Sequence, residues 1–401
     1  MVESIGQENK KLKEAQDWYR YAREHPMEKK YRELNDENVK YFTGVDQGWD
    51  KHGDRGKLKQ EGRPAITMNH VHPLVRLICG ARPKLDTTFL PIGDNDSYAA
   101  DVFSACKDHI EHQNKWEFKE EDWFKYFIIV NRAVISIMPN DSRDIRGEVD
   151  LKLEDGAKFY LDWDAVEKDR SDATYLFYVP GISKEEAFRL WPGKKDAIES
   201  FIGQVEGFVP TQTRDVSQSD GYKDPQGEFY NAETKKLYPV YYWYKSYEKA
   251  TKIVDKATNA VYPSKMKKVE AEERLKEIDG VGRYTVVERD YVRIKYMVFI
   301  EDIVFEEGIT PWERKDGQRS LLSERFPYII AEPEVLRFGV QQYLVDIIDS
   351  LKDPQMYHNK LASSILHIIN SQAKSGIDYE EGAISDSELK KLQEHGSKPG
   401  H

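Results

Sequence analysis

Four aspartates, Asp162, Asp164, Asp169 and Asp172, form the part of the sequence with the clearest potential for chemistry. Carboxylate oxygens suit Mg²⁺, and a bound Mg²⁺ can assist hydrolysis of a phosphodiester. Asp is equally typical of turns at strand ends, because its side chain accepts hydrogen bonds from nearby backbone N–H groups. The Arg170-Ser171 pair and the lack of a nearby Glu-x-Lys sequence favour turns. A metal-dependent, DNA-processing nuclease that uses these four aspartates is kept as the alternative function.

The histidines and cysteines give weaker signals. His70 and His72 are two residues apart, so on a helix they point to different faces, whereas on a strand they would share one. Without a nearby cysteine, a structural role is favoured. Cys79 and Cys106 are too few for a Cys₄ zinc site and are interpreted as buried free thiols of a reducing cytoplasm. We predict no metal site and no cofactor.

The sequence also lacks the common catalytic motifs. It contains no GxxxxGK[ST] phosphate loop, and its nearest piece, Gly193-Lys194-Lys195, lacks the first glycine and the hydroxyl residue. No GxSxG, HExxH or protein-kinase motif occurs either. We therefore predict that the chain is not an enzyme, and the absence of a phosphate loop argues against an ATPase motor.

The composition indicates a folded protein with more than one structural unit. Of the 401 residues, 39% are hydrophobic and 12% aromatic, well above the content of a disordered chain. The 60 Lys and Arg against 71 Asp and Glu give 60 − 71 = −11, which disfavours a protein that binds DNA through many phosphate contacts. No stretch is long and apolar enough for a membrane helix, and no signal peptide is present, so we expect a soluble chain that is not exported.

The spacing of apolar residues predicts an α+β fold. Before residue 134 the apolar residues have helical spacing, and from about residue 146 they alternate with polar residues with a period of two. Further along the chain, segments of both kinds occur. The predicted helices cover about 12–22, 31–42, 71–80, 97–110, 118–134, 183–190 and 263–278, and the predicted strands about 149–153, 159–163, 238–247 and 284–305. Residues 204–235 are interpreted as a long loop.

The last large element is predicted to be one long helix from Pro333 to about Gln372. Two apolar stripes, one on each side of Pro354, have helical spacing. Proline removes one backbone hydrogen bond and clashes with the preceding turn, so a kink is expected at Pro354.

Several segments, in this order, resemble the portal (head-to-tail connector) protein family of short-tailed bacteriophages. The segment 62–69 is similar to the family's opening "GRP, apolar, then Asn" sequence, and 97–113 with 123–129 is similar to its paired wing helices. Trp163-Asp164-Ala165, together with residues 169–173, resembles the family's "WDP, then D-x-SDA" stretch. Phe326-Pro327-Tyr328, followed by residues 351–355, resembles the part of the family sequence that leads into the stem helix. Where the family usually has Gly-x-Gly and a proline, this chain has Asn131-Arg132-Ala133 and Ala165.

The resemblance implies a portal-type fold with a wing, a clip and a long kinked stem helix. The implied organisation is an N-terminal helical segment (1–61), a wing α+β region (62–235), a clip-like α+β region (236–325), a stem helix (326–376) kinked at Pro354, and a truncated tail (377–401). The chain would be a structural ring subunit of the phage portal vertex that forms the channel for DNA packaging and ejection. Family members continue beyond this point, so we expect that the molecule does too.

The resemblance also implies partners and a location. The chain would bind itself as a ring, expected to be a dodecamer, and would dock the terminase packaging motor, head-completion or tail adaptor proteins, and the capsid or scaffold protein. Double-stranded DNA would pass through non-specifically, and no membrane would be involved. The protein would be assembled in the host cytoplasm and located in the virion. Asn359, Ser363, Asn370 and Lys374, near the expected kink, are the candidates for facing the channel.

Overall fold

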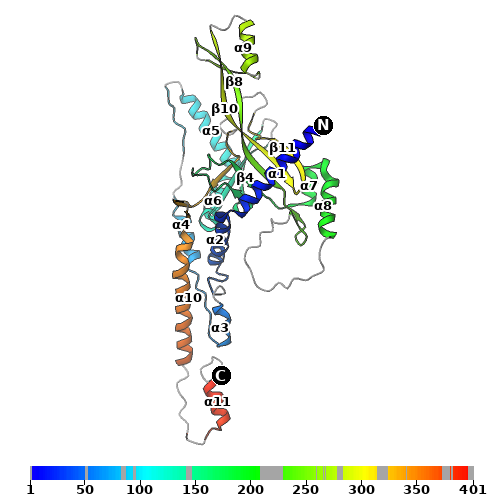
Figure 1. Ribbon diagram of the computed structural model, residues 1–401. Coiled ribbons are helices and arrows are strands. Elements are labelled where there is room, and N and C mark those ends of the chain that lie inside the picture. The colour runs from blue at the N-terminus through cyan, green and yellow to red at the C-terminus, as the bar shows by residue number, and fades with distance from the viewer. Residues whose placement is uncertain are drawn as a thin grey trace. The chain divides into compact units, whose positions relative to one another are not determined.

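The structure is a computed structural model that describes residues 2–49, 53–82, 87–93, 96–140, 147–207, 229–258, 260–264, 266, 268–277, 283–313, 324–339, 341–372, 380 and 383–395 (Figure 1). The chain divides into two compact units. Unit 1 comprises Met1–Lys30, Phe89–Lys119 and Ala133–Ala331, and unit 2 comprises Tyr31–Thr88, Glu120–Arg132 and Glu332–His401. Helices and antiparallel sheets confirm the predicted α+β class.

Unit 1 is built on a six-stranded sheet with the order β11-β10-β8-β4-β3, to which β9 adds by pairing with β8. The two longest strands, β8 and β10, pair antiparallel from Val240↔Phe299 to Asp255↔Tyr284, and α9 lies near the far end of this pair in Figure 1. The strands are β3 (Phe159–Leu161), β4 (Tyr175–Tyr178), β8 (Val240–Asp255), β9 (Val261–Ser264), β10 (Tyr284–Ile300) and β11 (Ile303–Ile309).

Two smaller sheets and several helices complete unit 1. One sheet has the order β12-β1-β2 and the other the order β5-β7-β6. Their strands are β1 (Ala133–Asn140), β2 (Glu148–Asp155), β12 (Tyr328–Ala331), β5 (Ile182–Ser183), β6 (Tyr230–Asn231) and β7 (Lys236–Leu237). The helices are α1 (Val2–Glu24), α5 (Ser97–Gln113), α7 (Lys184–Leu190), α8 (Lys195–Gly207) and α9 (Lys268–Glu277).

Helix α1 forms part of the core of unit 1. Its residues Leu12, Ala15, Tyr19 and Ala22 recur at helical spacing and are all buried in one cluster with sheet residues. The Tyr19 ring lies 5.3 Å from that of Phe177 in β4, at an interplanar angle of 57°. The helix was predicted, and its apolar face is part of the core of unit 1.

Unit 2 is mainly helical, with one hairpin. Helix α2 (Pro26–Thr43) lies in it from Tyr31 onward and helix α6 (Trp116–Val130) from Glu120 onward. The other elements are α3 (Asp54–Gln60), α4 (Val71–Gly80), β13 (Glu334–Phe338), β14 (Gln341–Val345), α10 (Ile347–Gln372) and α11 (Asp386–His395). The apolar core joins α2, α4, α6 and the start of α10, where Ile348 is completely buried.

The end of α6 explains one departure from the family sequence. Asn131 has a φ of 54°, a left-handed conformation that Asn tolerates better than most residues with a side chain. Its neighbour Arg132 is fully buried, and its guanidinium carbon lies 3.9 Å from the centre of the Tyr31 ring. Arg132 Nε also donates to Glu332 at 2.9 Å. Asn131 thus supplies the left-handed turn, while Arg132 fills the space below it.

Three expectations need correction. Residues 334–345 form a two-stranded hairpin, so the last helix begins at Ile347 and not near Pro333. Gly339, with a φ of 61°, provides the tight turn that ends β13. The expected boundary at 235/236 separates β4 from β8, yet the two strands pair in one sheet. Cys106 is exposed and Cys79 only half-buried, so neither is a buried thiol.

The predicted helices 71–80, 97–110, 118–134 and 183–190 and the predicted strands 149–153 and 159–163 agree within a few residues with α4, α5, α6, α7, β2 and β3. Other bounds differ more: β8 continues to Asp255, the region 284–305 divides into β10 and β11, α9 begins only at Lys268 after the strand β9, and α1 and α2 begin earlier than predicted. In the predicted loop 204–235, α8 runs to Gly207 and β6 lies at Tyr230–Asn231, and 208–228 lies outside the described residues. Ser183 caps α7 as predicted, accepting a hydrogen bond from the Glu186 N–H at 3.2 Å. Helix α10 continues through Pro354, and the kink itself stays a prediction. No helix among the described residues has the length and apolar character needed to span a membrane.

Candidate functional site

Helix α10 carries the predicted channel-facing residues, and Asp346 determines where it begins. The Asp346 Oδ1 atom accepts a hydrogen bond from the backbone N–H of Ile348 at 3.0 Å, which is the geometry of an N-terminal cap. Its Oδ2 atom accepts from Asn38 of α2. Because both Asp346 and Asn38 are buried, the start of α10 is fixed to α2.

One face of α10 is polar and buried. Its residues are Lys352, Gln355, Asn359 and Ser363, spaced three or four apart, and all have less than 9% of their surface exposed. Lys352 forms ion pairs with Glu37 and Asp349 at 3.2 and 3.0 Å. The three uncharged residues contact the extended segment 63–70 instead.

This segment lies along α10 and is held by its own backbone N–H groups. Three of these donate to the helix: Ile66 N–H to Ser363 Oγ at 2.9 Å, Met68 N–H to Asn359 Oδ1 at 2.9 Å, and His70 N–H to Gln355 Oε1 at 3.0 Å. The donors are two residues apart and the acceptors four apart. Two extended residues span about 6.6 Å and four helical residues about 6.0 Å, so the two repeats match.

The acceptor side chains also increase in length along the contact. Ser363, Asn359 and Gln355 place their accepting oxygen one, two and three bonds beyond Cβ, respectively. The backbone of segment 63–70 can therefore move gradually away from the helix axis and keep a hydrogen bond at each step. The residue types, and not only their polarity, fit this path.

The amide groups of the same residues satisfy one another. The Gln355 Nε2 donates to Asn359 Oδ1 at 3.0 Å, and the Asn359 Nδ2 donates to Gln47 Oε1 at 2.8 Å. Gln47 in turn donates to the Tyr41 carbonyl at 2.9 Å. A buried polar group must be paired to avoid a cost of about 1–3 kcal/mol, and this network pairs them. The network links α10 both to segment 63–70 and to Gln47 within unit 2.

The opposite face of α10 is apolar and exposed. Leu361 is two residues from both Asn359 and Ser363, about 200° around the helix from each. Its side chain is 60% exposed. We call the exposed set on this side the apolar stripe: Tyr357, Leu361, Ile365, Ile368 and Ile369, each between 48% and 67% exposed. A surface helix ordinarily buries its apolar face and exposes its polar face, and in α10 this arrangement is reversed.

These facts correct the predicted channel-facing set. Asn359 and Ser363 are buried within unit 2, with 1% and 4% of their surface exposed, and their polar atoms are already bonded. Neither is available to DNA in this unit. Asn370 is half-buried, and Lys374 lies outside the described residues. Sequence analysis missed Gln47, Gln355 and Asp346, although the polar residues at 355, 359 and 363 share a spacing of four that marks one helix face.

The four aspartates lie in a turn of unit 1, and three of them bind backbone N–H groups. Asp162 accepts from the Thr174 N–H at 2.9 Å and from its hydroxyl at 2.7 Å. Asp172 accepts from the Val166 and Glu167 N–H groups, and Asp169 from the Ser171 N–H at 3.1 Å. This bonding supports the turn interpretation.

The pKa values of two of these aspartates follow from the same turn. Hydrogen bonds from Ser171 lower the pKa of Asp169, with a smaller effect of Arg325, which lies 3.1 Å away. For Asp172, partial burial would raise the pKa, but the Val166 and Glu167 N–H groups outweigh it and lower the pKa. Both carboxylates therefore stay ionised as acceptors of the turn. Among the described residues, no three His, Cys, Asp or Glu side chains form a group that could hold a metal ion.

The two histidines make ring contacts, in agreement with the structural role that was favoured. The His72 ring stacks on Phe42 at 4.7 Å between centroids, and the His70 ring meets His358 edge-on at 4.5 Å. His72 lies on α4 and His70 is the residue directly before it.

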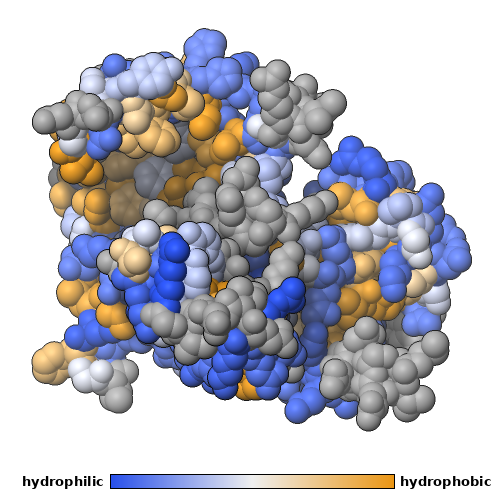
Figure 2. Space-filling view, turned by 90° about the horizontal axis from the view of Figure 1, so that it is seen from above, coloured by the Kyte–Doolittle hydropathy of each residue, from blue (hydrophilic) through white to orange (hydrophobic). Residues whose placement is uncertain are grey.

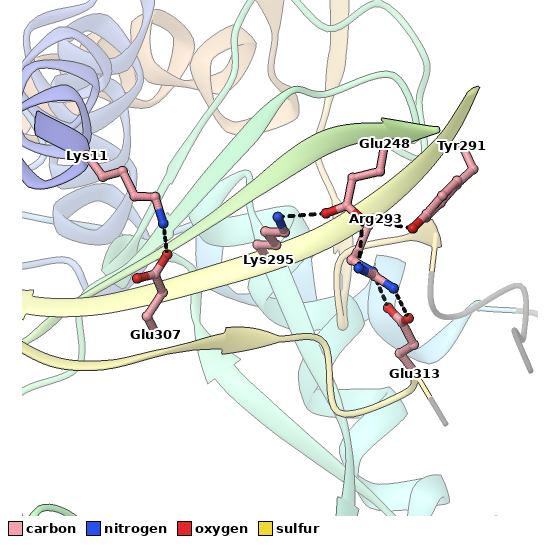
Figure 3. A network of polar contacts seen from close by, with 7 residues as sticks. All are labelled: Lys11, Glu248, Tyr291, Arg293, Lys295, Glu307 and Glu313. Atoms are coloured by element: carbon pink, nitrogen blue, oxygen red, sulfur yellow. Dashed lines mark hydrogen bonds and ion pairs between the residues drawn. The ribbon is translucent and has the colours of Figure 1, made fainter. Parts of the chain in front are cut away.

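A second polar network lies on unit 1, where alternate residues of β10 share one face (Figure 3). Arg293 donates to both carboxylate oxygens of Glu313, at 2.7 and 2.9 Å, and to Glu248 of β8 at 2.6 Å. Tyr291 and Lys295 also bind Glu248, at 2.8 and 2.7 Å. Partial burial would raise the pKa of Glu248, but these donors and their positive charges outweigh it and lower the pKa.

Comparison with known proteins gives one clear result. A family model described as "Phage P22-like portal protein" matches residues 16–401. No curated protein matches the chain.

Proposed function

Because the chain belongs to the P22-like phage portal protein family, and so is a structural component of the portal vertex of a bacteriophage, we propose that its copies close into a ring around a channel for DNA. The family implies an oligomeric ring that interacts with capsid and packaging components. The proposed channel carries the genome during packaging and ejection, and the proposed ring is a dodecamer. No catalytic role is proposed.

The observation that carries this proposal is the apolar stripe of α10. Its five large side chains are about half to two-thirds exposed, whereas the polar face of the same helix is buried. Burial of apolar surface stabilises association by roughly 25 cal/mol per Å². A neighbouring copy in a ring would remove this stripe from water, and we assign α10 as the stem helix on this basis.

A closed ring requires two different surfaces on each copy, because its contacts are head-to-tail. Unit 2 offers a second exposed apolar position on α4, where Leu77 is 68% exposed and lies two residues, about 200° around the helix, from the core residue Val75. Hydrophobic residues also gather in patches on the face of the molecule drawn in Figure 2. These features suit a chain that is stable in contact with copies of itself.

The motor, the adaptors and the capsid or scaffold protein would use other surfaces. In the region expected to be clip-like, α9 carries charges of both signs, with Lys268 4.0 Å from Glu272. Such mixed charge affects partner choice and encounter rate more than affinity. We propose this end of the β8–β10 pair as a docking surface for the terminase motor and the tail adaptors in turn.

The acidic balance suits a channel that DNA slides through. Each Lys or Arg that contacts a phosphate adds to DNA affinity by releasing a counterion, so a channel rich in them would retain the duplex. The net charge of −11 opposes such retention. Of the channel-facing candidates, Asn370 and Lys374 remain as proposals, since Asn359 and Ser363 are buried.

The test is the native mass of the purified chain, measured by light scattering after size exclusion and paired with negative-stain imaging. Particles of about twelve copies with an axial hole are expected. Nucleic acid and other phage proteins are left out, so that any ring comes from the chain alone. Monomers at every concentration tested would contradict ring formation by this chain.

A matched pair of variants tests the role of the stripe. Leu361→Asp places a charge on it, and Val269→Asp makes the same kind of change at a 65% exposed position of α9. Because both sites are exposed, both chains should fold, which circular dichroism checks. Leu361→Asp is expected to abolish rings, and Val269→Asp is expected to retain them. If the two variants assembled equally well, the apolar stripe would not be part of the interface.

A further inference from the structure

The hairpin formed by β13 and β14 has little support from its own chain. Among the residues that the structure describes, its strands pair with each other and with no third strand, from Glu334↔Val345 to Phe338↔Gln341. An isolated two-stranded hairpin is at best marginally stable in water, and a third strand or a packed face is needed. The stability of this element therefore depends on what covers its faces.

The register puts the large apolar side chains of the hairpin on one face. Residues directly opposite each other point to the same side, so Leu336 and Tyr343 form one pair there, with Phe338 and Val345 on either side. The exposed fractions of these four side chains are 51%, 45%, 82% and 46%. We call this the open face of the hairpin.

The other face is turned toward the protein's own unit. Val335, Gln342 and Leu344 alternate with the open-face residues and are half-buried, while Arg337 on the same face is exposed. The apolar side chains of this face are thus more covered than those of the open face. The open face carries two aromatic and two aliphatic side chains, with the exposed polar residues Glu334 and Gln341 at its two ends.

We propose that the open face is a docking surface for a second copy of this chain, in the ring on which the proposed function rests. Permanent homo-oligomeric contacts are more apolar at their centre than transient ones and are rich in aromatic residues. The only charged side chain on this face is Glu334, at its edge. A transient partner such as a packaging motor would be expected to bind a face with more charged side chains. The phosphate backbone of DNA would likewise require positively charged side chains on this face.

The open face also continues along the chain into the apolar stripe. Val345 belongs to the face, Asp346 caps α10, and Ile347, the first residue of the helix, is 44% exposed. The buried Asp346 therefore joins two apolar surfaces of one unit that are both left uncovered. One neighbouring copy could cover both, which would order the hairpin as the ring forms.

Hydrogen exchange tests this proposal on the full chain. Amide exchange of residues 334–338 and 341–345 is measured in the assembled ring and in the free chain, the latter kept dissociated by dilution. We expect exchange in the ring to be slower by about tenfold or more, which corresponds to stabilisation of the hairpin by about 1.4 kcal/mol or more through contact with the neighbouring copy. Rings that leave this exchange unchanged would overturn the docking proposal while the proposed function stands. Failure to form rings at all would instead count against the proposed function.

A variant pair gives a second readout. Phe338→Asp alters the most exposed residue of the open face, and Tyr262→Asp alters a 52% exposed aromatic residue on β9. Phe338→Asp is expected to raise the concentration for half-assembly by about tenfold or more, and Tyr262→Asp to leave it unchanged. Circular dichroism checks that both chains fold. An unchanged assembly midpoint for Phe338→Asp would contradict the proposal.

Discussion

At the scale of single residues, the polar groups of α10 act as structural acceptors. A side chain such as Asn359 is polar enough to face a channel, but its two polar atoms here bind the segment 63–70 and Gln47. The extended segment has no sheet partner for the Ile66, Met68 and His70 N–H groups. Because buried N–H groups must be paired, the helix provides oxygens at the matching spacing.

Removing the central acceptor should therefore reduce stability. Asn359→Leu leaves the Met68 N–H and the Gln47 oxygen without partners, and we expect a loss of about 3 kcal/mol in the free energy of unfolding. Ser363→Ala, which removes one acceptor, should cost about 1 kcal/mol. Urea unfolding measures both, with Ser364→Ala as the neighbouring control that should have little effect. Equal midpoints for Asn359→Leu and Ser364→Ala would show that the network contributes nothing.

The polar network on β10 predicts a dependence on pH. Because its folded-state pKa is lowered, the Glu248 carboxylate stabilises the fold fully above the ordinary value of 4.5, and this contribution is lost as the pH falls through the lowered pKa. Glu248→Gln should cost about 1 kcal/mol at neutral pH, reduced by solvent screening, and almost nothing at about pH 3. Urea midpoints of both chains at the two pH values test this. A difference that persists in acid would assign the effect to packing.

At the scale of elements, the segment 333–346 shows how a helical pattern can be misleading. Val335, Phe338 and Leu344 fit a helical stripe, yet the segment pairs as a hairpin around Gly339. Short apolar runs fit both periods, and the turn residue decides between them. The helix, which was expected to begin at Pro333, instead begins after the cap at Asp346.

Gly339 should consequently be sensitive to substitution. Its φ of 61° lies in the left-handed region, where a Cβ costs roughly 1–2 kcal/mol. No atom lies within 4 Å of the position that a Cβ would take, so backbone conformation alone sets the cost. Gly339→Ala should speed amide exchange in the hairpin, while Gly339→Asn, which tolerates this conformation, should change it less. Identical exchange in the two variants would contradict this account.

At the scale of the whole molecule, charge and apolar surface point to the same kind of function. The chain is acidic, it belongs to a portal family, and unit 2 leaves apolar side chains uncovered on α10 and on the β13–β14 hairpin. Uncovered apolar surface favours association, while a negative balance opposes tight binding to DNA. A ring that holds itself together firmly and holds DNA weakly needs both properties.

Much of this could be predicted from the sequence because it depends on local rules. Helical spacing predicted α1, α4, α5 and α6, alternation predicted β2 and β3, and the Ser183 cap predicted α7. The turn role of Asp169 and Asp172 also followed from residue type. The order of short motifs indicated the portal family, which the match over residues 16–401 shows.

Only the tertiary structure decided which face of α10 is covered. Helical spacing identifies two faces, one polar through Gln355, Asn359 and Ser363 and one apolar through Leu361 and Ile365, and ordinarily the apolar face is the buried one. Here the segment 63–70, far away in the sequence, lies on the polar face because its backbone N–H groups need acceptors. That pairing depends on two distant segments meeting in space, so no local pattern contains it, and it leaves the apolar face of α10 exposed.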